Sequence, residues 1–328
     1  MKFFLVPLIG SAVILLGILI GLGPWALITA LLLTALEVTL SFDNAVVNAK
    51  VLTTMTPKWQ KRFLTWGMLI AVFGTRLILP ILIVSASVWM SPLMVAKLAA
   101  FNPEAYGHLL EGAKHAIYAF GATFLLMVSL KYFFDETKGV HWIKLIERKL
   151  VKWGRIEAIE IGIALLSLIL ISFLVGEEQA TVLVAGITGI ILFISMQGLA
   201  NSFSAGVAQA GAAGLSLFLY LNVLDSAFSL DSVVGAFALT TAIPVIVAGL
   251  GIGAWFVRSL TIYFVKMKTL DTLVYLEHGA HWAIFGLAAC MFSGLLFEVP
   301  EIITGGIGIV FVAAAYYSSL RFQKASRK

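Results

Sequence analysis

About ten apolar segments, each near 20 residues long, follow one another along the chain. An α-helix needs about 20 mostly apolar residues to cross the roughly 30 Å of hydrocarbon in a bilayer. Hydrophobic residues make up 61% of the 328 residues and charged residues only 12%, which leaves too little polar surface for a soluble domain of this length. The expected spans are 4–22, 26–49, 64–89, 113–134, 157–175, 180–200, 213–239, 243–265, 281–298 and 302–320. The sequence therefore predicts an all-α polytopic membrane protein, in which the whole chain forms one transmembrane domain.

Lysine and arginine are shared unequally between the two sets of loops. If the N-terminus is inside, the inner loops hold the basic clusters at 50–62 and 138–155, whereas the outer loops hold only Lys97 and Lys114. Loops rich in Lys and Arg stay on the cytoplasmic side of a membrane. We therefore expect both termini in the cytoplasm. This distribution also accounts for the net charge of +5, so we expect membrane lipid and not nucleic acid as a partner.

The linker 141–153 has the pattern of a separate helix. Four of its apolar residues fall on one helical face and three bases on the others: Ile143, Ile146, Leu150 and Trp153, against Lys144, Arg148 and Lys152. A helix of this kind rests on a membrane surface with its bases near anionic headgroups. A solvated linker that sets the topology explains the same residues equally well, and neither interpretation makes the segment catalytic.

Two of the apolar segments contain the same acidic pattern. Glu37-x3-Ser41-x-Asp43-Asn44 lies in the segment 26–49, and Asp225-x3-Ser229-x-Asp231-Ser232 lies in the segment 213–239. A carboxylate at hydrocarbon depth costs several kcal/mol unless it is compensated, and such residues mark substrate or ion pathways. Four of them make an ion or substrate pathway the default hypothesis.

Further matches between the two parts of the chain follow in the same order. Leu110-Glu111-x3-His115 corresponds to Leu276-Glu277-x3-His281, and the intramembrane Arg76 corresponds to Arg258. Five expected spans separate the equivalent residues, so the two parts must cross the membrane in opposite directions. Inverted halves with polar sites near the midplane are typical of secondary transporters. The sequence predicts two inverted five-helix repeats, approximately residues 1–155 and 156–328.

Polar side chains form one stripe along each of the two acidic spans. The first stripe is Thr34, Glu37, Ser41, Asn44 and Asn48, and the second is Asn222, Asp225, Ser229 and Ser232. Lipid cannot satisfy the hydrogen bonds of such a stripe, so it must face the bundle interior or water.

Asp43 and Asp231 do not belong to these stripes. Six residues along a straight helix turn a side chain by about 600°, which leaves it about 120° away with about 9 Å of axial rise. Two carboxylates placed in this way cannot bind one ion at the usual oxygen distances of about 2.0–2.6 Å. Either the helices are unwound near Ser41 and Ser229, or each carboxylate pairs with one from the other half. Both solutions bring the four acids towards one site.

The chemistry of this expected site is that of oxygen ligands. Asn44, Ser41, Ser229 and Asn222 add neutral oxygens to the four carboxylates, and such a set suits Mn²⁺, Mg²⁺ or Ca²⁺. The single cysteine, Cys290, excludes a cysteine-based metal cluster. In the competing interpretation, Asp43 and Asp231 only pair with Arg76 and Arg258 to hold helices together.

The two Glu-x3-His pairs permit more than one role. Spacing of four residues places Glu111 with His115, and Glu277 with His281, on one helical face, which allows metal binding or proton exchange. An interfacial hydrogen-bonded pair explains them equally well. The chain has no HExxH, GxSxG or P-loop pattern, so we expect neither an enzyme nor a prosthetic group.

The paired acidic motifs resemble the signatures of TerC/Alx-type membrane proteins of the LysE-like transporter superfamily, most clearly over spans two, three and seven. The Leu-Glu-x3-His elements and the ten-span length resemble a sister branch and leave the exact substrate open. The resemblance implies an exporter of a divalent cation, above all Mn²⁺, in a bacterial inner membrane. It also implies Glu37, Asp43, Asn44, Asp225 and Asp231 as metal ligands.

We therefore expect a transporter that moves a divalent cation as its substrate out of the cytoplasm. Protonation of the acids, or of His115 and His281, would couple the transport to protons, and Arg76 and Arg258 would neutralise the empty site. The alternative is a membrane assembly or stress-response scaffold of the tellurium-resistance type, in which the acid–arginine pairs are structural.

Overall fold

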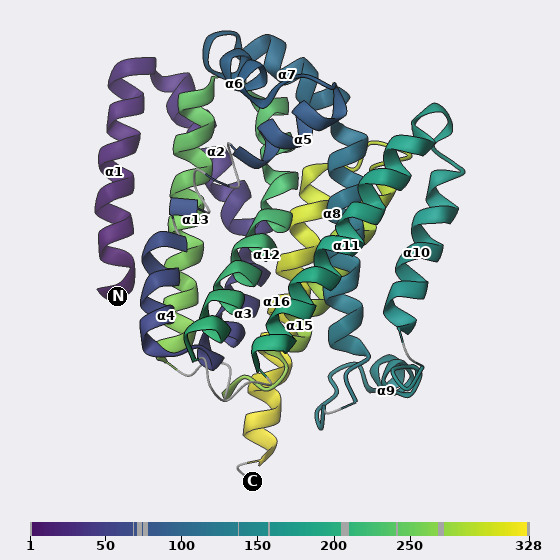
Figure 1. Ribbon diagram of the computed structural model, residues 1–328. Helices are drawn as coiled ribbons and strands as arrows, with labels where there is room; N and C mark the ends of the chain where they lie inside the picture. The colour runs from purple at the N-terminus through teal and green to yellow at the C-terminus, as the bar shows by residue number, and fades with distance from the viewer. Residues whose placement is uncertain are drawn as a thin grey trace.

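The computed structural model describes residues 2–326, except 68, 71–73, 75–77, 137, 157, 205–209, 241 and 268–271. No strand occurs among the described residues. The helices are α1 (Lys2–Leu22), α2 (Pro24–Leu40), α3 (Phe42–Thr54), α4 (Pro57–Arg62), the π-helical η1 (Phe63–Gly67), α5 (Leu79–Ser87), α6 (Pro92–Phe101), α7 (Pro103–Gly112), α8 (Lys114–Phe133), α9 (Lys144–Trp153), α10 (Ile159–Ser172), the 3₁₀ turn η3 (Gly176–Glu178), α11 (Gln179–Ser204), α12 (Ala210–Leu239), α13 (Ile243–Lys266), α15 (Leu276–Ser293) and α16 (Glu301–Ser326). The prediction of an all-α fold is confirmed (Figure 1).

Four stretches of the described chain are long and apolar enough to cross a bilayer: Phe4–Leu22, Lys114–Phe133, Gly176–Gly198 and Ile243–Lys266. A fifth span results if α2 and α3, which meet at a 50° bend, are taken together. These helices identify a membrane protein. Helices α10, α12, α15 and α16 lie in further expected spans, but the count of ten spans and the inverted repeat stay predictions.

Helices α6 and α7 were not expected from the sequence. Each has ten residues and begins with proline after a capping residue: the Ser91 side chain accepts a hydrogen bond from the Met94 amide, and Asn102 accepts one from the Ala105 amide. A Ser-Pro or Asn-Pro pair is a helix-start signal that could have indicated both. Together they cover one end of the bundle, at the top of Figure 1.

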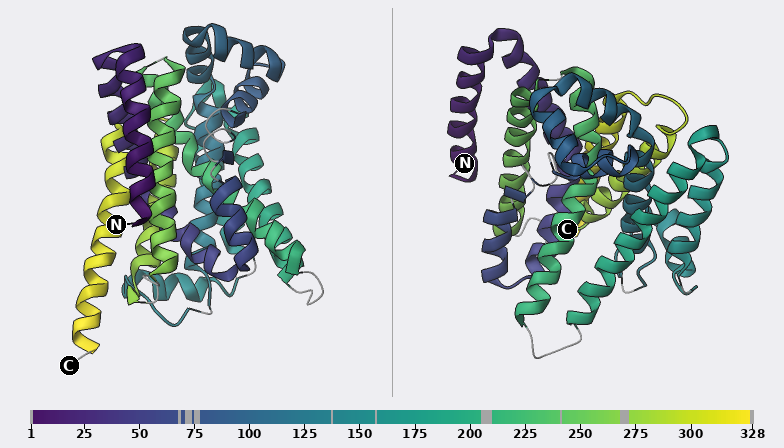
Figure 2. Two further views of the ribbon diagram at one scale, coloured as in Figure 1. Left: turned by 90° about the vertical axis from the view of Figure 1, so that its left-hand side faces the viewer. Right: turned by 45° about the horizontal axis from the view of Figure 1, so that its top comes forward.

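Helix α8 lies at the centre of the bundle and α1 at its edge, since 78% of the α8 span is buried but only 17% of the α1 span. Helix α8 packs against α11 on one side and α15 on the other, while α13 packs against α1, α2 and α3 (Figures 1 and 2). Each half of the chain thus contributes helices to the surroundings of the other.

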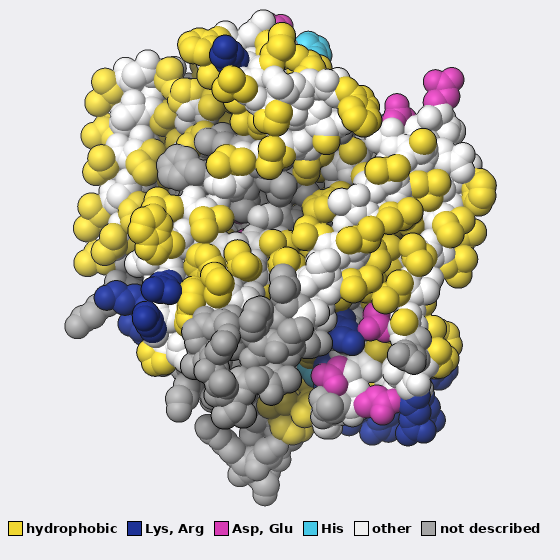
Figure 3. Space-filling model, in the orientation of Figure 1, with side chains coloured by type: hydrophobic (Ala, Val, Ile, Leu, Met, Phe, Trp, Pro, Cys, Tyr) yellow, Lys and Arg dark blue, Asp and Glu magenta, His cyan; other side chains and the backbone are white. Residues whose placement is uncertain are grey.

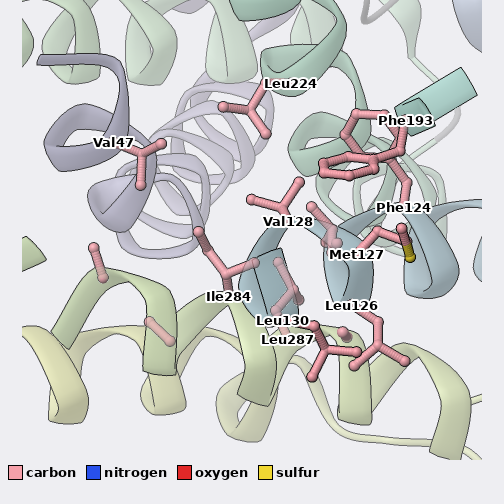
Figure 4. Packing of buried hydrophobic residues seen from close by; sticks show 14 of the residues in the cluster. Val47, Phe124, Leu126, Met127, Val128, Leu130, Phe193, Leu224, Ile284 and Leu287 are labelled. Carbon is pink, nitrogen blue, oxygen red and sulfur yellow. The ribbon is translucent and has the colours of Figure 1, made fainter. Parts of the chain in front are cut away.

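The core around α8 is apolar and closely packed. In Figure 4, Phe124 and Met127 of α8 lie near Phe193 of α11, and the Phe124 and Phe193 rings meet edge to face with centroids 5.8 Å apart. Helix α11 approaches α8 closely because Gly189 has no side chain: a Cβ there would lie 2.5 Å from the Phe120 carbonyl oxygen. This dense packing fixes the helices that carry the polar residues.

Basic side chains gather towards one end of the molecule. Figure 3 shows an apolar belt over most of the visible face and basic side chains mainly at its lower end, where α4 and α9 lie. Helix α16 also ends there. An apolar belt with basic side chains mainly at one end is the surface expected of a protein embedded in a bilayer.

Candidate cation site

The first acidic motif lies at a break between two helices. Helix α2 ends at Leu40 and α3 begins at Phe42, with Ser41 between them and a 50° bend. The Ser41 hydroxyl donates a hydrogen bond to Glu37 Oε1 at 2.8 Å, and Asp43 Oδ1 accepts one from the Asn44 amide at 3.0 Å at the start of α3. A carboxylate is favourable at a helix N-terminus because free amide groups point towards it. The interruption expected near Ser41 is therefore present.

The corresponding interruption in the second half is absent. Helix α12 runs without a break from Ala210 to Leu239 and includes Ser229. Unwinding near Ser229, which was one of two alternatives, is therefore wrong. The side chains of Ser229 and Asp231 lie outside the described part of the structure.

The two polar stripes meet where α3 and α12 pack together. Asn48 Nδ2 donates a hydrogen bond of 2.6 Å to Asp225 Oδ1. Asn48 comes from the first half of the chain and Asp225 from the second, so at least one acid of the second motif contacts the stripe of the first. Asn48 was placed in the stripe by its spacing but was not among the expected ligands.

Three amide oxygens of these stripes are buried without a hydrogen-bond donor. They are Oδ1 of Asn44, Asn48 and Asn222, and none has a partner among the described residues. The Asn222 nitrogen is already used, since Nδ2 donates to the Phe218 carbonyl at 2.6 Å. A buried carbonyl oxygen without a partner costs about 1–3 kcal/mol. An oxygen-binding cation is one species that would satisfy such groups.

The described side chains near the contact of Asn48 with Asp225 do not supply a complete set of metal ligands. Glu37 and Asp43 are buried, as are Asn222 and Ser232 on α12. No three His, Cys, Asp or Glu side chains in the described part of the chain converge as metal ligands. Binding of a cation would therefore use amide and hydroxyl oxygens beside the carboxylates.

Arg258 of α13 lies beside this region. Its guanidinium carbon is 3.9 Å from the centre of the Phe63 ring, and Nη2 donates to the Phe63 carbonyl in η1. The positive charge of Arg258 also interacts electrostatically with the Asp225 carboxylate. Asp43 makes no ion pair with a described base, while the predicted pairs of Asp43 with Arg76 and of Asp231 with Arg258 involve side chains outside the described part of the structure. The expected partner Arg76 lies outside the described residues.

Close contact between α2 and α13 fixes the Glu37 side chain. A Cβ at Gly253 would lie 2.5 Å from Glu37 Cβ, and one turn earlier the Thr34 hydroxyl donates to the Gly249 carbonyl at 3.1 Å. Small residues spaced four apart allow helix backbones to approach in this way.

Replacing Gly253 by alanine is expected to lower the thermal unfolding temperature in detergent. The added methyl group collides with Glu37, and overpacking of this kind costs about 1–3 kcal/mol. Gly17→Ala in α1 is the matched control, because a Cβ there meets nothing within 4 Å. Equal stability of the two variants would show that α2 moves freely away from α13.

The two Glu-x3-His pairs lie on different helices, one at the junction of α7 and α8 and the other at the start of α15. Glu111 is exposed at the end of α7, and His115 is half-buried in α8 beyond the interruption at Ala113. The expectation that these two share one helical face is therefore wrong, because two separate helices carry them. Glu277 and His281 lie in the first turns of α15, where the Glu277 carboxylate pairs with Lys50 Nζ at 2.9 Å.

Glu147 of α9 is a buried acid that the sequence analysis did not single out. It is only 2% exposed and accepts hydrogen bonds from Trp282 Nε1 at 3.0 Å and the Trp142 amide at 2.9 Å, while His278 Nδ1 lies 2.9 Å from Oε2. Burial alone would raise the pKa of Glu147, but the bonds from His278, Trp282 and the Ile143 amide outweigh it and lower the pKa to about 2. The sequence feature that could have indicated Glu147 is that it is the single acidic residue in a helix with four basic residues.

The outer side of α9 keeps exposed apolar residues next to its bases. Leu145, Ile146 and Trp153 are 78%, 43% and 54% exposed, whereas Leu150 is half-buried against the core. The segment forms the expected helix, but only part of its apolar face packs on the protein. That α9 lies on a membrane surface stays a prediction.

Buried polar stripes from two parts of the chain, held together inside an apolar helical bundle, define a polytopic membrane protein with an internal polar site. The chain belongs to the family described as Protein of unknown function (DUF475), which matches residues 42–326. No curated protein and no solved structure matches it.

Proposed function

We propose that the protein is a secondary transporter that exports a divalent cation, with Mn²⁺ as the preferred substrate. The observation that carries the proposal is the contact between Asn48 and Asp225, which joins the polar stripes of the two halves beside three buried amide oxygens without partners. Buried oxygens without partners are uncommon in folded proteins because each costs free energy, so three on the two stripes support a bound ligand.

The proposed ligands are the carboxylates of Glu37, Asp43, Asp225 and Asp231 and the amide oxygen of Asn44, with Asn48 and Asn222 beside them. Carboxylate and amide oxygens bind hard and borderline divalent ions. Several acids balance the charge of a dication in a medium where an unpaired charge is costly. The likeness of the acidic motifs to TerC/Alx-type proteins supports Mn²⁺ within this group.

In the proposed cycle, the ion enters from the end that carries α4 and α9. Their bases favour the cytoplasmic side, which would place both termini in the cytoplasm of a bacterium and the chain in its inner membrane. The bend at Ser41 is a natural place for one helix half to move against the other. Protonation of the acids, or of His115 and His281, would release the ion on the outside.

A scaffold without transport remains the second candidate. The observation in its favour is that Arg258 binds the carbonyl and ring of Phe63 and that Glu37 accepts a hydrogen bond from Ser41, as structural groups would. It does not account for the three amide oxygens without partners.

Purified protein in liposomes tests the proposal. Uptake is measured for Mn²⁺, Mg²⁺, Ca²⁺, Zn²⁺ and Co²⁺, with and without a pH gradient. We expect Mn²⁺ to accumulate faster than Mg²⁺ and Ca²⁺, and a pH gradient to increase the rate. Absence of transport for all five ions, in protein that unfolds cooperatively, would favour the scaffold.

A further inference from the structure

A cavity of about 640 Å³ opens between the end of α8, the start of α10, and helices α11, α12 and α15. We call it the lower cavity, because it lies at the end of the molecule that carries α9 in Figure 1. Its polar lining consists mainly of Lys131, Asp135, Glu136, Glu160, Gln197 and His281. A hydrated ion with six waters of about 30 Å³ each fits this volume easily.

The imidazole of His281 has one nitrogen, Nδ1, whose hydrogen-bonding role is fixed by its neighbour. The side chain is 93% buried yet lines the cavity, and its Nδ1 lies 2.8 Å from the Glu277 carbonyl oxygen. A carbonyl oxygen only accepts, so Nδ1 carries the hydrogen and Nε2 of the neutral ring keeps its lone pair. No described residue donates to Nε2. Histidines that bind metals are oriented in this way, by a bond from the second nitrogen to a carbonyl.

The ring is also held rigidly. It stacks on Tyr132 of α8, with the centroids 3.5 Å apart and the planes 6° from parallel. A fixed ring loses little conformational entropy when it binds an ion.

The lower cavity has carboxylates along its wall. Three carboxylates and one ammonium line it; Glu160 pairs with Lys131 at 3.1 Å and Glu136 pairs with Arg155 at 3.5 Å. Lys138 lies against the Tyr132 ring and outside the lining of the cavity, and burial lowers the pKa of Lys138 to about 7. Carboxylates along the wall of a cavity are groups through which a hydrated cation can be held.

We propose that the lower cavity binds a divalent transition-metal ion through Nε2 of His281, as a capture site separate from the buried acidic motifs. This inference rests on the proposed function, because the site would collect the ion that the transporter carries. No three His, Cys, Asp or Glu side chains converge in the described part of the chain, so the ion keeps most of its water and the carboxylates act through it. A nitrogen ligand favours Mn²⁺, Co²⁺ and Zn²⁺ over Mg²⁺ and Ca²⁺.

Cobalt binding tests the capture site. Co²⁺ is added to the purified full-length protein in detergent, and its visible absorption is followed in wild type, His281→Gln and His108→Gln. His108 is the matched control because it is an exposed histidine on α7, away from the cavity. We expect His281→Gln to weaken binding at least tenfold and remove the imidazole-dependent absorption, whereas His108→Gln changes neither. Mg²⁺ at equal concentration should not displace the Co²⁺.

Histidine-selective ¹⁵N NMR of the unmodified protein keeps the test valid if His281→Gln does not fold. Zn²⁺ should shift one Nε2 resonance, and the same shift should occur in Asp225→Asn. Co²⁺ binding that is unchanged in His281→Gln, or a shift that disappears in Asp225→Asn, overturns the separate site. Transport without binding at His281 defeats only this inference, whereas binding at His281 without transport defeats the proposed function and leaves a metal site.

Discussion

Asp225→Asn is expected to reduce the initial rate of Mn²⁺ uptake into liposomes at least 100-fold. Asparagine has nearly the same volume, and its Oδ1 still accepts the hydrogen bond from Asn48, so α3 and α12 remain in contact. The change removes one negative charge from the proposed ligands. In the wild-type protein the charge of Arg258 interacts with the Asp225 carboxylate, and the variant leaves this buried guanidinium without that negative charge. A 100-fold loss corresponds to about 2.8 kcal/mol, which is modest for a lost charge beside a dication.

Two variants separate loss of charge from loss of fold. Glu178→Gln removes an exposed acid from the η3 turn and should transport as wild type does. Asp225→Glu keeps the charge and should recover part of the rate. Full activity of a correctly folded Asp225→Asn protein would remove Asp225 from the site and leave the contact with Asn48 purely structural.

The helices could be predicted from the sequence wherever an apolar run decides the structure. The run 113–134 became α8 and the run 243–265 became α13, each within one residue at either end. Runs of this kind have no alternative in a bilayer, because every backbone group must be satisfied within the segment. Helix α15 instead begins five residues before its expected span, since amphipathic first turns carry no strong apolar signal.

The site was less predictable because it depends on contacts between distant segments. Spacing on one helix placed Asn48 in the polar stripe, but only packing of α3 against α12 revealed that it meets Asp225. Spacing left unwinding at both serines as one of two alternatives, and only Ser41 lies at a break. Similar motifs need not adopt equal backbones, because the neighbouring helices differ. Spacing placed His281 on a helix with Glu277, but it could not reveal the stacking on Tyr132, which lies on another helix.

Glu147→Gln is expected to destabilise the protein at neutral pH by on the order of 3 kcal/mol. The carboxylate joins α9 to α15 through Trp282 and His278, and it accepts the Trp142 and Ile143 amides that precede α9. Burial opposes the charged form, but these bonds lower the pKa of Glu147 from 4.5 to about 2. A pKa shift of one unit corresponds to about 1.4 kcal/mol, so the difference between these two pKa values sets the upper limit of the loss in unfolding free energy.

The sign of the pH dependence follows from the lowered pKa of Glu147. The stabilisation is complete above pH 4.5, where the carboxylate is ionised in the folded and unfolded chain, and is lost as the pH falls from 4.5 towards 2. The difference in unfolding temperature between wild type and Glu147→Gln should therefore be large at pH 7 and smaller at pH 3. Glu136→Gln is the control, because its 3.5 Å pair with Arg155 is exposed and contributes about 1 kcal/mol at most. A difference of equal size at both pH values would mean that Glu147 acts through packing and not through its charge.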